Sequence, residues 1–481
     1  MNNYPRLVIA GVRGGSGKTT LSLGLIAALK SQKGLKVIPF KKGPDYIDAG
    51  WMSEAAKNPC YNLDPFFLTR EKIMESFIAH FIGDIAIIEG NRGLYDGMDV
   101  EGSYSTAELS KFLHSPVILI VDCTKMTRTA AAVALGCVNL DRDVNIKGVV
   151  LNQVSGGRHE SIVRQSIERY CSLPVLGAIP RLKSEEMPER HMGLTPYQEH
   201  PDTSKALVTV EDIAKKYLDL DAILDIAMKA EQIGNGSHFM SLRGAGATKQ
   251  SHPNEIASPS ARNDSSDKVK IGVIRDSAFQ FYYPENLEEL ERNGAELVEI
   301  NAIEGERLPD IDGLYIGGGF PETNAIKLAE NEGFRRSVRE AVENGLPVYA
   351  ECGGLMFLGD SIVVGDKAYP MVGIFPLVFE MRERPQAHGY TIVEVKKDNP
   401  FYPMGTILHG HEFHYSALVK AQEKADVYTA FGMKRGQGIK DKADGICYKN
   451  TLATYTHIHA LGVPEWAAGF IKKAKEFKER V

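Results

Sequence analysis

The sequence lacks the long apolar runs that membrane-spanning helices require. Its apolar stretches, such as residues 116–121, fall far short of the roughly 20 residues that cross a bilayer. The apolar run near the N-terminus is only a few residues long and leads straight into a glycine-rich loop, which is not the pattern of a secretory signal. We therefore expect a protein with no membrane partner.

Clustered cysteines and an excess of positive charge are missing as well. The six cysteines are scattered, with no C-x-x-C pair and no Cys/His cluster at metal-ligand spacing. With 56 Lys and Arg against 62 Asp and Glu, the chain carries a net charge of −6 and lacks the basic footprint of nucleic-acid binding. These features predict a cytoplasmic protein with reduced thiols and no nucleic-acid partner.

The length of 481 residues exceeds one ordinary hydrophobic core, so more than one domain is expected. From residue 5 to about residue 230, short β-branched runs alternate with longer helical patterns, which predicts a parallel sheet covered by helices on both faces. The strand candidates are RLVIAGV, KVIPFKK, DIAIIEG, PVILIVD, IKGVVLN and LPVLGAI. The pattern then stops and resumes at VKIGVIRD, continuing through AELVEI, GLYIGGG, LPVYAECGG and LATYTHIHA. We predict an α/β protein with domains over 1–231 and 269–481, joined by a linker over 232–268.

A glycine-dense loop, GVRGGSGKTT at residues 11–20, lies between the first strand candidate and a helical pattern. Strand, loop and helix N-terminus together direct backbone N–H groups at phosphate oxygens. Lys18 can then reach the β- and γ-phosphates of ATP, and Thr19 can hold Mg²⁺. Val12 stands where the usual pattern has its first glycine, but a simple turn would not need the Lys-Thr pair. The predicted nucleotide-binding residues are Gly15, Gly17, Lys18, Thr19 and Thr20.

Charged residues follow other strand candidates of the first domain. Ligands of doubly wound sheets bind at the carboxyl ends of the strands, so carboxylates there are candidate metal ligands. We predict Thr19, Asp45 and Glu89 as Mg²⁺ ligands. Asp48 and Asp96 lie in similar places and are equally well explained as turn residues. Positive charge for phosphate or an anionic substrate would come from Lys41, Lys42 and Arg92. 

The contact to adenine cannot be recovered from the sequence. Asn152, at the end of IKGVVLN, is one candidate, and a turn residue is an equally good interpretation.

The second domain places Cys352 between an apolar strand candidate and two glycines that open a helical pattern. A strand–turn–helix corner of this kind holds a nucleophile above backbone N–H groups that can stabilise an oxyanion. A second glycine loop, IGGGFPE at residues 316–322, also follows a strand and can lend another donor. The predicted oxyanion residues are Gly318, Gly319 and Gly353. 

A nucleophilic cysteine needs a base, and two groups of histidines compete for that role. One is HGHEFH, with His409, His411 and His414; the other is THIH, with His457 and His459. The residues alone leave this choice open. The remaining five cysteines are interpreted as small buried apolar residues.

Eight motifs in order resemble one family over nearly the full length of the chain. They are KKGPDYID, IEGNRGLYDG, ERHMGL, RDSAFQFYYPEN, YIGGGFPE, AECGGLMFL, GHEFHYS and YTHIH. The first half resembles the dethiobiotin-synthetase-like ATP-binding domain. The second half resembles a class I glutamine amidotransferase domain of the cobyrinic/cobyric acid synthase family.

This resemblance implies an enzyme that uses ATP, Mg²⁺ and glutamine to amidate the a- and c-acetate carboxylates of cobyrinate, through an acyl phosphate. It implies Cys352 as the glutaminase nucleophile and His457 as its base. It also implies that Tyr46, Asp48 and Asp96 lie near the corrinoid. Many amidotransferases carry His-x-Glu, but the third residue here is His459, so we expect a Cys/His dyad with no carboxylate that orients the base.

Two alternatives stay open. Asn91 and Arg92 depart from the Val-Met usual in the family, so the substrate can instead be sirohydrochlorin, its nickel chelate or sirohaem. The other alternative is a partitioning-type ATPase switch with an inactive amidotransferase-like binding module. The order of the two amidations and the oligomeric state stay open, with a homodimer as one option.

Overall fold

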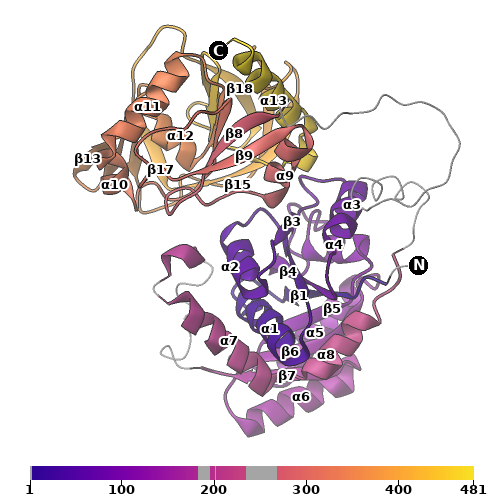
Figure 1. The fold of residues 1–481 in the computed structure, drawn as a ribbon. Coiled ribbons are helices and arrows are strands. Elements are labelled where there is room, and N and C mark those ends of the chain that lie inside the picture. Colours follow the sequence, from indigo (N-terminus) through magenta and orange to yellow (C-terminus); the bar gives the residue numbers. More distant parts are fainter. Residues whose placement is uncertain (1–2, 183–195, 201, 234–267, 481) are drawn as a thin grey trace, which may run out of the picture. The chain divides into compact units, whose positions relative to one another are not determined.

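The computed structural model describes residues 3–182, 196–200, 202–233 and 268–480. The ERHMGL motif and nearly all of the expected linker lie outside these residues. The chain divides into two compact units, Met1–Asn263 and Asp264–Val481, and each is treated by itself below (Figure 1). 

The first unit contains a seven-stranded parallel sheet in the order β3-β2-β4-β1-β5-β6-β7. The strands are β1 (Arg6–Gly11), β2 (Val37–Lys42), β3 (Tyr61–Leu63), β4 (Ile85–Gly93), β5 (Val117–Asp122), β6 (Ile146–Val154) and β7 (Val175–Pro180). The parallel sheet expected from the alternating pattern is confirmed. β3 was not expected, because three residues are too few to show a periodicity.

Helices cover both faces of this sheet, as Figure 1 shows. They are α1 (Lys18–Lys33), α2 (Ile47–Ala56), α3 (Arg70–His80), α4 (Thr106–Phe112), α5 (Arg128–Leu140), α6 (Gly157–Cys171), α7 (Thr203–Tyr217), α8 (Leu220–Met228) and the 3₁₀ turn η2 (Tyr197–Glu199). Consecutive residues of β1 are buried, which is the pattern of a strand with apolar layers on both sides. The apolar core joins α1, α2, α7 and α8 to Leu7 and Ile9 on one face.

The second unit is built on a ten-stranded mixed sheet in the order β21-β16-β15-β18-β19-β20-β11-β10-β8-β9. Its parallel half, from β20 to β9, consists of β8 (Val269–Ile274), β9 (Ala295–Ile300), β10 (Gly313–Ile316), β11 (Val348–Glu351) and β20 (Thr451–Thr454). The antiparallel half consists of β15 (Ala387–Val395), β16 (Ile407–His414), β18 (Tyr428–Arg435), β19 (Ala443–Tyr448) and β21 (His457–Ile458). The parallel half matches runs that the sequence indicated as strands, whereas in the antiparallel half only the two-residue β21, inside LATYTHIHA, falls in such a run.

A second, four-stranded sheet packs into the same unit. Its strands are β12 (Ser361–Val364), β13 (Lys367–Pro370), β14 (Leu377–Met381) and β17 (Ser416–Ala421), in the order β13-β12-β14-β17. The helices of the unit are α9 (Pro284–Arg292), α10 (Ala325–Glu330), α11 (Glu332–Glu343), α12 (Gly353–Leu358), α13 (Pro464–Lys478) and the 3₁₀ turn η4 (Ala460–Gly462). No helix in the described part of the chain has both the length and the apolar character of a membrane span.

Candidate functional site

The glycine-rich loop of the first unit connects β1 to α1. Gly15 and Gly17 take positive φ angles of 69° and 92°, which glycine adopts without strain. A Cβ added at Gly17 would lie 2.5 Å from Asn152 Nδ2, so this position has no room for a side chain. No acidic residue stands in the first turn of α1, whose N-terminal N–H groups are therefore suited to an anion.

Asn152 braces this loop. Its Nδ2 donates to the carbonyl oxygen of Ser16 at 2.9 Å, and its Oδ1 accepts the N–H of Gln153 at 2.9 Å. Both ends of the amide are thus engaged by backbone. The structure gives Asn152 a bracing role that neither interpretation of the sequence included.

Lys18 points into the same region. Its Nζ donates to the carbonyl oxygen of Arg92 at 2.7 Å and lies 3.5 Å from that of Arg13. Burial lowers the pKa of Lys18, although the charge of Glu89 opposes this. The carbonyl contacts hold a cation in place without neutralising it, so its charge stays available for a phosphate.

A buried cluster of charges lies at the carboxyl ends of β2 and β4. Lys41 Nζ contacts Asp48 Oδ2 at 2.6 Å and Glu89 Oε1 at 2.8 Å, and Thr19 Oγ1 donates to the same Glu89 oxygen at 2.8 Å. Burial alone would lower the pKa of Lys41, but the two carboxylates outweigh it and raise that pKa. The structure therefore joins Thr19 to Glu89, as the predicted Mg²⁺ ligands require.

Asp45 stands at the edge of this cluster. Its Oδ1 accepts the N–H of Asp48 at 2.7 Å, in the first turn of α2. Burial, together with the negative charge of Asp48, raises the pKa of Asp45 to about 7. Asp45 is thus a carboxyl group that a nearby cation would readily ionise.

The donor set fits Mg²⁺. Glu89 Oε2 is buried and has no hydrogen-bond partner among the described residues, while its other oxygen already contacts Thr19. Across those residues, no three or more His, Cys, Asp or Glu side chains are grouped as a metal cage. Mg²⁺ at nucleotide sites commonly takes only one or two carboxylates and completes its shell with phosphates and water.

Of the three residues expected near the substrate, two have clear local contacts. Asp48 pairs with Lys41, and Asp96 Oδ2 accepts the N–H of Gly93 at 2.8 Å, as a turn residue does. Tyr46 precedes the first residue of α2 and is half-buried. Asp48 is thus part of the buried cluster of charges, and Tyr46 lies two residues before it in the chain.

In the second unit, Cys352 forms a sharp corner between β11 and α12. Its φ of 48° and ψ of −98° lie in a strained region for a residue with a side chain. The N–H of Cys352 donates to the carbonyl oxygen of Thr454 at 2.7 Å, and the thiol lies 3.9 Å from the carbonyl oxygen of Phe413. This is the geometry expected of a nucleophile held on a strand–turn–helix corner.

His457 is the histidine that reaches Cys352. The Cys352 side chain and the carboxylate of Glu351 both stabilise the charged imidazole, and Glu351 Oε2 lies 3.2 Å from His457 Nδ1. Burial would lower the pKa of His457, but these two partners raise it to about 10. The expected dyad without a carboxylate is wrong: Glu351 contacts the base from the residue next to the nucleophile.

Two histidines of the HGHEFH motif, His411 and His414, are also buried in this unit. His411 stacks on His457 with ring centres 4.9 Å apart and meets Tyr283 Oη at 3.3 Å. His414 Nδ1 lies 2.8 Å from the carbonyl oxygen of Ser416. Burial lowers the pKa of His414 to about 4 and that of His411 well below its usual value, so both rings are neutral. 

His459 lies deeper in the unit. Its Nε2 is 3.4 Å from Glu285 Oε1, and both side chains are buried. The half-buried His409 lies two residues before His411 on β16.

The glycines predicted to line an oxyanion site lie together beside the base. A Cβ added at Gly318 would approach His457 Cε1 to 2.5 Å, and one at Gly353 would lie 3.1 Å from the nitrogen of Gly319. Gly353 is the first residue of α12, so its N–H has no carbonyl partner within the helix. The two glycine loops thus approach each other next to Cys352.

Sequence reasoning missed a second buried carboxylate, Asp444. It accepts hydrogen bonds from Thr454 Oγ1 at 2.7 Å, from the N–H of Tyr455 at 3.0 Å and from the N–H and Oγ1 of Thr456 at 3.2 and 3.1 Å. These three residues immediately precede His457. Asp444 belongs to a strand that the sequence did not indicate, so no signal pointed to it, whereas Glu351 stood visibly beside the nucleophile.

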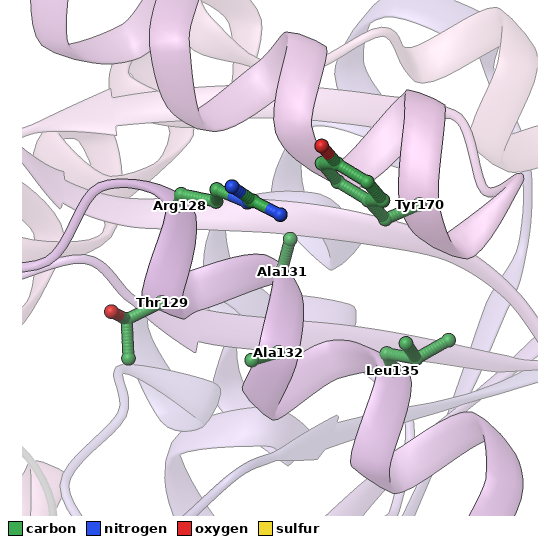
Figure 2. A pocket seen from close by; sticks show the side chains of 6 residues that line it. All are labelled: Arg128, Thr129, Ala131, Ala132, Leu135 and Tyr170. Atoms are coloured by element: carbon green, nitrogen blue, oxygen red, sulfur yellow. The ribbon is translucent and has the colours of Figure 1, made fainter.

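Away from both sites, a hollow of about 330 Å³ opens between α5 and α6 (Figure 2). Its lining is mainly apolar, with Ala131, Ala132 and Leu135 on α5. The Arg128 guanidinium lies 4.9 Å from the centre of the Tyr170 ring at one end. The hollow contains none of the predicted site residues.

Two family models match the chain: the CobQ/CobB/MinD/ParA nucleotide binding domain over residues 7–194 and the CobB/CobQ-like glutamine amidotransferase domain over residues 270–464. Curated relatives match almost from end to end. The cobyrinate a,c-diamide synthase of Magnetococcus marinus is 41% identical over 96% of both chains, and that of Archaeoglobus fulgidus 42% over 99% of both. That of Methanothermobacter thermautotrophicus is 40% identical over 98% of this chain and 100% of its own.

Proposed function

This chain belongs to the cobyrinate a,c-diamide synthase family and is a glutamine-dependent amide ligase; on that premise we propose that it converts the a- and c-acetate carboxylates of cobyrinate to amides. The first unit activates each carboxylate with ATP, and the second unit releases ammonia from glutamine. The observation that carries this proposal is the contact between Cys352 and His457 on a strained strand–turn–helix corner.

The glutaminase half-reaction begins at the Cys352 sulfur. The thiolate attacks the amide carbon of glutamine, and the N–H groups of the glycine loops stabilise the oxyanion that forms. His457 then gives a proton to the departing ammonia and leaves a thioester on Cys352. In the second step His457 removes a proton from water, which attacks the thioester and releases glutamate.

The synthetase half-reaction begins with attack of the substrate carboxylate on the γ-phosphorus of ATP, which releases ADP and leaves an acyl phosphate. Lys18 stabilises the charge that develops on the phosphoryl oxygens. Thr19, Glu89 and Asp45 would hold Mg²⁺, which when bound neutralises charge on the phosphates. Ammonia then attacks the acyl carbon, and phosphate leaves.

Substrate contacts are proposed for Tyr46, Asp48 and Asp96. The position of Asp48 beside Lys41 supports this assignment, because that pair lies next to Thr19 and Glu89. Asp96 also has the local turn contact described above, so its two roles need separate tests.

The test measures amide formation by mass spectrometry after incubation with ATP, Mg²⁺ and cobyrinate. Each amide formed makes the product lighter by the difference between a hydroxyl and an amino group. Cys352→Ala should abolish the reaction with glutamine and keep it with ammonium salt, while Lys18→Met should abolish both. Equal loss of both activities in Cys352→Ala would contradict the assignment of ammonia release to the second unit.

Parallel incubations with sirohydrochlorin, its nickel chelate and sirohaem compare the substrates directly. Cobyrinate should be the one that is converted with two successive losses of mass. A glutaminase assay separates the enzyme from the ATPase switch, since an inactive amidotransferase module would hydrolyse no glutamine. The contacts joining Cys352, His457 and Glu351 support the enzyme.

A further inference from the structure

We propose that Glu351 is the positioning residue of the glutaminase site, holding His457 in the orientation and tautomer in which Nε2 faces Cys352. The inference rests on the proposed roles of Cys352 and His457. Glu351, which directly precedes the nucleophile Cys352, is then the third residue of the catalytic group. Many amidotransferases instead have a glutamate two places after the base, where this chain has His459.

The carboxylate of Glu351 contacts the imidazole of His457 and two further residues of the sheet. Its Oε2 lies 3.2 Å from His457 Nδ1, and its side chain is fully buried. Tyr315 Oη donates to the same oxygen at 3.3 Å, and the N–H of Ile458 donates to Oε1 at 3.4 Å. Both carboxylate oxygens are therefore fixed, which leaves the ring of His457 one preferred orientation.

The tautomer follows from this contact. A carboxylate can only accept at Nδ1, so Nδ1 carries a proton and Nε2 is the nitrogen left to exchange a proton with the thiol. Without this partner, a neutral imidazole could carry its proton on either nitrogen. Only the form with the proton on Nδ1 leaves Nε2 free to accept a proton from the thiol.

The residue two places after the base has a different partner. His459 approaches Glu285 at 3.4 Å, and the ring of Tyr283 lies 5.0 Å from that of His459. Within residues 268–480 the structure shows two buried Glu–His pairs, and one of them includes the histidine beside Cys352. Glu285 provides a matched control, because it is an equally buried glutamate paired with a histidine outside the reaction.

Of the titratable groups near His457, Cys352 and Glu351 favour the charged imidazole, and His411 and His414 are neutral. Since an opposite charge within about 4–6 Å shifts a pKa by roughly 1–3 units, removing the carboxylate should discourage the thiolate–imidazolium pair. Alkylation of Cys352 at a given pH should then be slower, because the thiolate would lose its stabilising imidazolium.

The experiment compares Glu351→Gln, Glu351→Ala, Glu351→Asp and the control Glu285→Gln in the full chain. One readout is the rate at which iodoacetamide alkylates Cys352, located by peptide mass spectrometry, as a function of pH. The second is glutaminase turnover, and the third is synthesis with ammonium salt.

Both the Gln and Ala variants of Glu351 should move the alkylation profile upward by about 1–3 pH units. Glutaminase turnover should fall by roughly 10²–10⁴-fold, the range of general acid–base catalysis, with ammonium-dependent synthesis retained. Glu351→Asp should restore part of the turnover, and Glu285→Gln should leave the alkylation profile in place. Because Gln can still accept from Nδ1–H, its turnover should exceed that of Ala.

An unchanged alkylation profile in Glu351→Gln, or an equal shift in Glu285→Gln, would overturn the assignment. These outcomes are distinct from failure of the proposed function. If the unmodified chain hydrolyses no glutamine, the glutaminase proposal itself is wrong, whatever the profiles of the variants.

Discussion

Alanine substitutions at three glycines of the nucleotide loop should have graded effects on stability. Gly14 has no positive φ and a Cβ there would meet nothing within 4 Å. Gly15 has the same open space but a φ of 69°. Gly17 has a φ of 92° and, in addition, the close approach to Asn152. The three positions therefore separate backbone strain from steric clash.

The magnitudes follow from these differences. Forcing an alanine into a left-handed conformation costs about 1–2 kcal/mol, so Gly15→Ala should be less stable than Gly14→Ala by that amount. In Gly17→Ala the new methyl group must also displace the Asn152 amide from Ser16, and the lost hydrogen bond adds about 1–3 kcal/mol. The gain from stiffening the unfolded chain is common to all three variants and cancels in the comparison.

The assay is denaturant unfolding of the nucleotide-free protein, followed by tryptophan fluorescence. Trp51 and Trp466 are the two tryptophans, both fully buried and one in each unit. In a Trp466→Phe background the signal therefore reports on the first unit alone.

The same measurement in an Asn152→Ala background tests whether the contact with Asn152 causes the additional cost of Gly17→Ala. With Asn152→Ala already present, Gly17→Ala should cost no more than Gly15→Ala costs in the starting protein. The reasoning is refuted if Gly17→Ala is as stable as Gly15→Ala, or if Asn152→Ala does not reduce its additional cost.

Three further outcomes are expected. Lys41→Met should leave the carboxylate of Glu89 buried without its cation, so ATP-dependent amidation should be lost while glutamine hydrolysis persists, measured by glutamate release. Asp444→Asn should lower glutaminase turnover by more than about tenfold, because an amide cannot accept all four hydrogen bonds before His457; ammonium-dependent synthesis is the control. The pKa of His457, raised to about 10 from 6.5, means that its contribution to stability is complete below pH 6.5 and is lost as pH rises through 10. Thermal unfolding followed at Trp466 should show this decline, and His457→Gln should remove that part of it.

Some features of this protein could be predicted from the sequence because they are local. The nucleotide loop needs glycines at positive φ followed by Lys18 and Thr19, and this requirement is visible within ten residues. The parallel strands are continuous apolar runs because both of their faces are buried. The corner at Cys352 was equally visible, since two glycines follow it directly.

The antiparallel half of the second sheet could not be predicted in the same way. Its strands alternate buried and exposed residues only irregularly, and β16 contains three histidines and a glutamate. The run LATYTHIHA looked like one strand, but the structure divides it into β20 and β21, which lie in different parts of the sheet. Asp444, ten or more residues away, binds the residues at the break and turns the chain there.

The sequence by itself determined which residues can do chemistry, because a nucleophile, a phosphate loop and a histidine are recognised by residue type and near neighbours. Only the tertiary structure decided which of them meet. Glu351 reaches His457 across 106 positions, and Lys41 reaches Glu89 across 48. Contacts of that kind depend on strand pairing and register, which set Glu351 opposite Thr454, three residues before His457, and Lys41 opposite Glu89, and which leave no trace in local spacing.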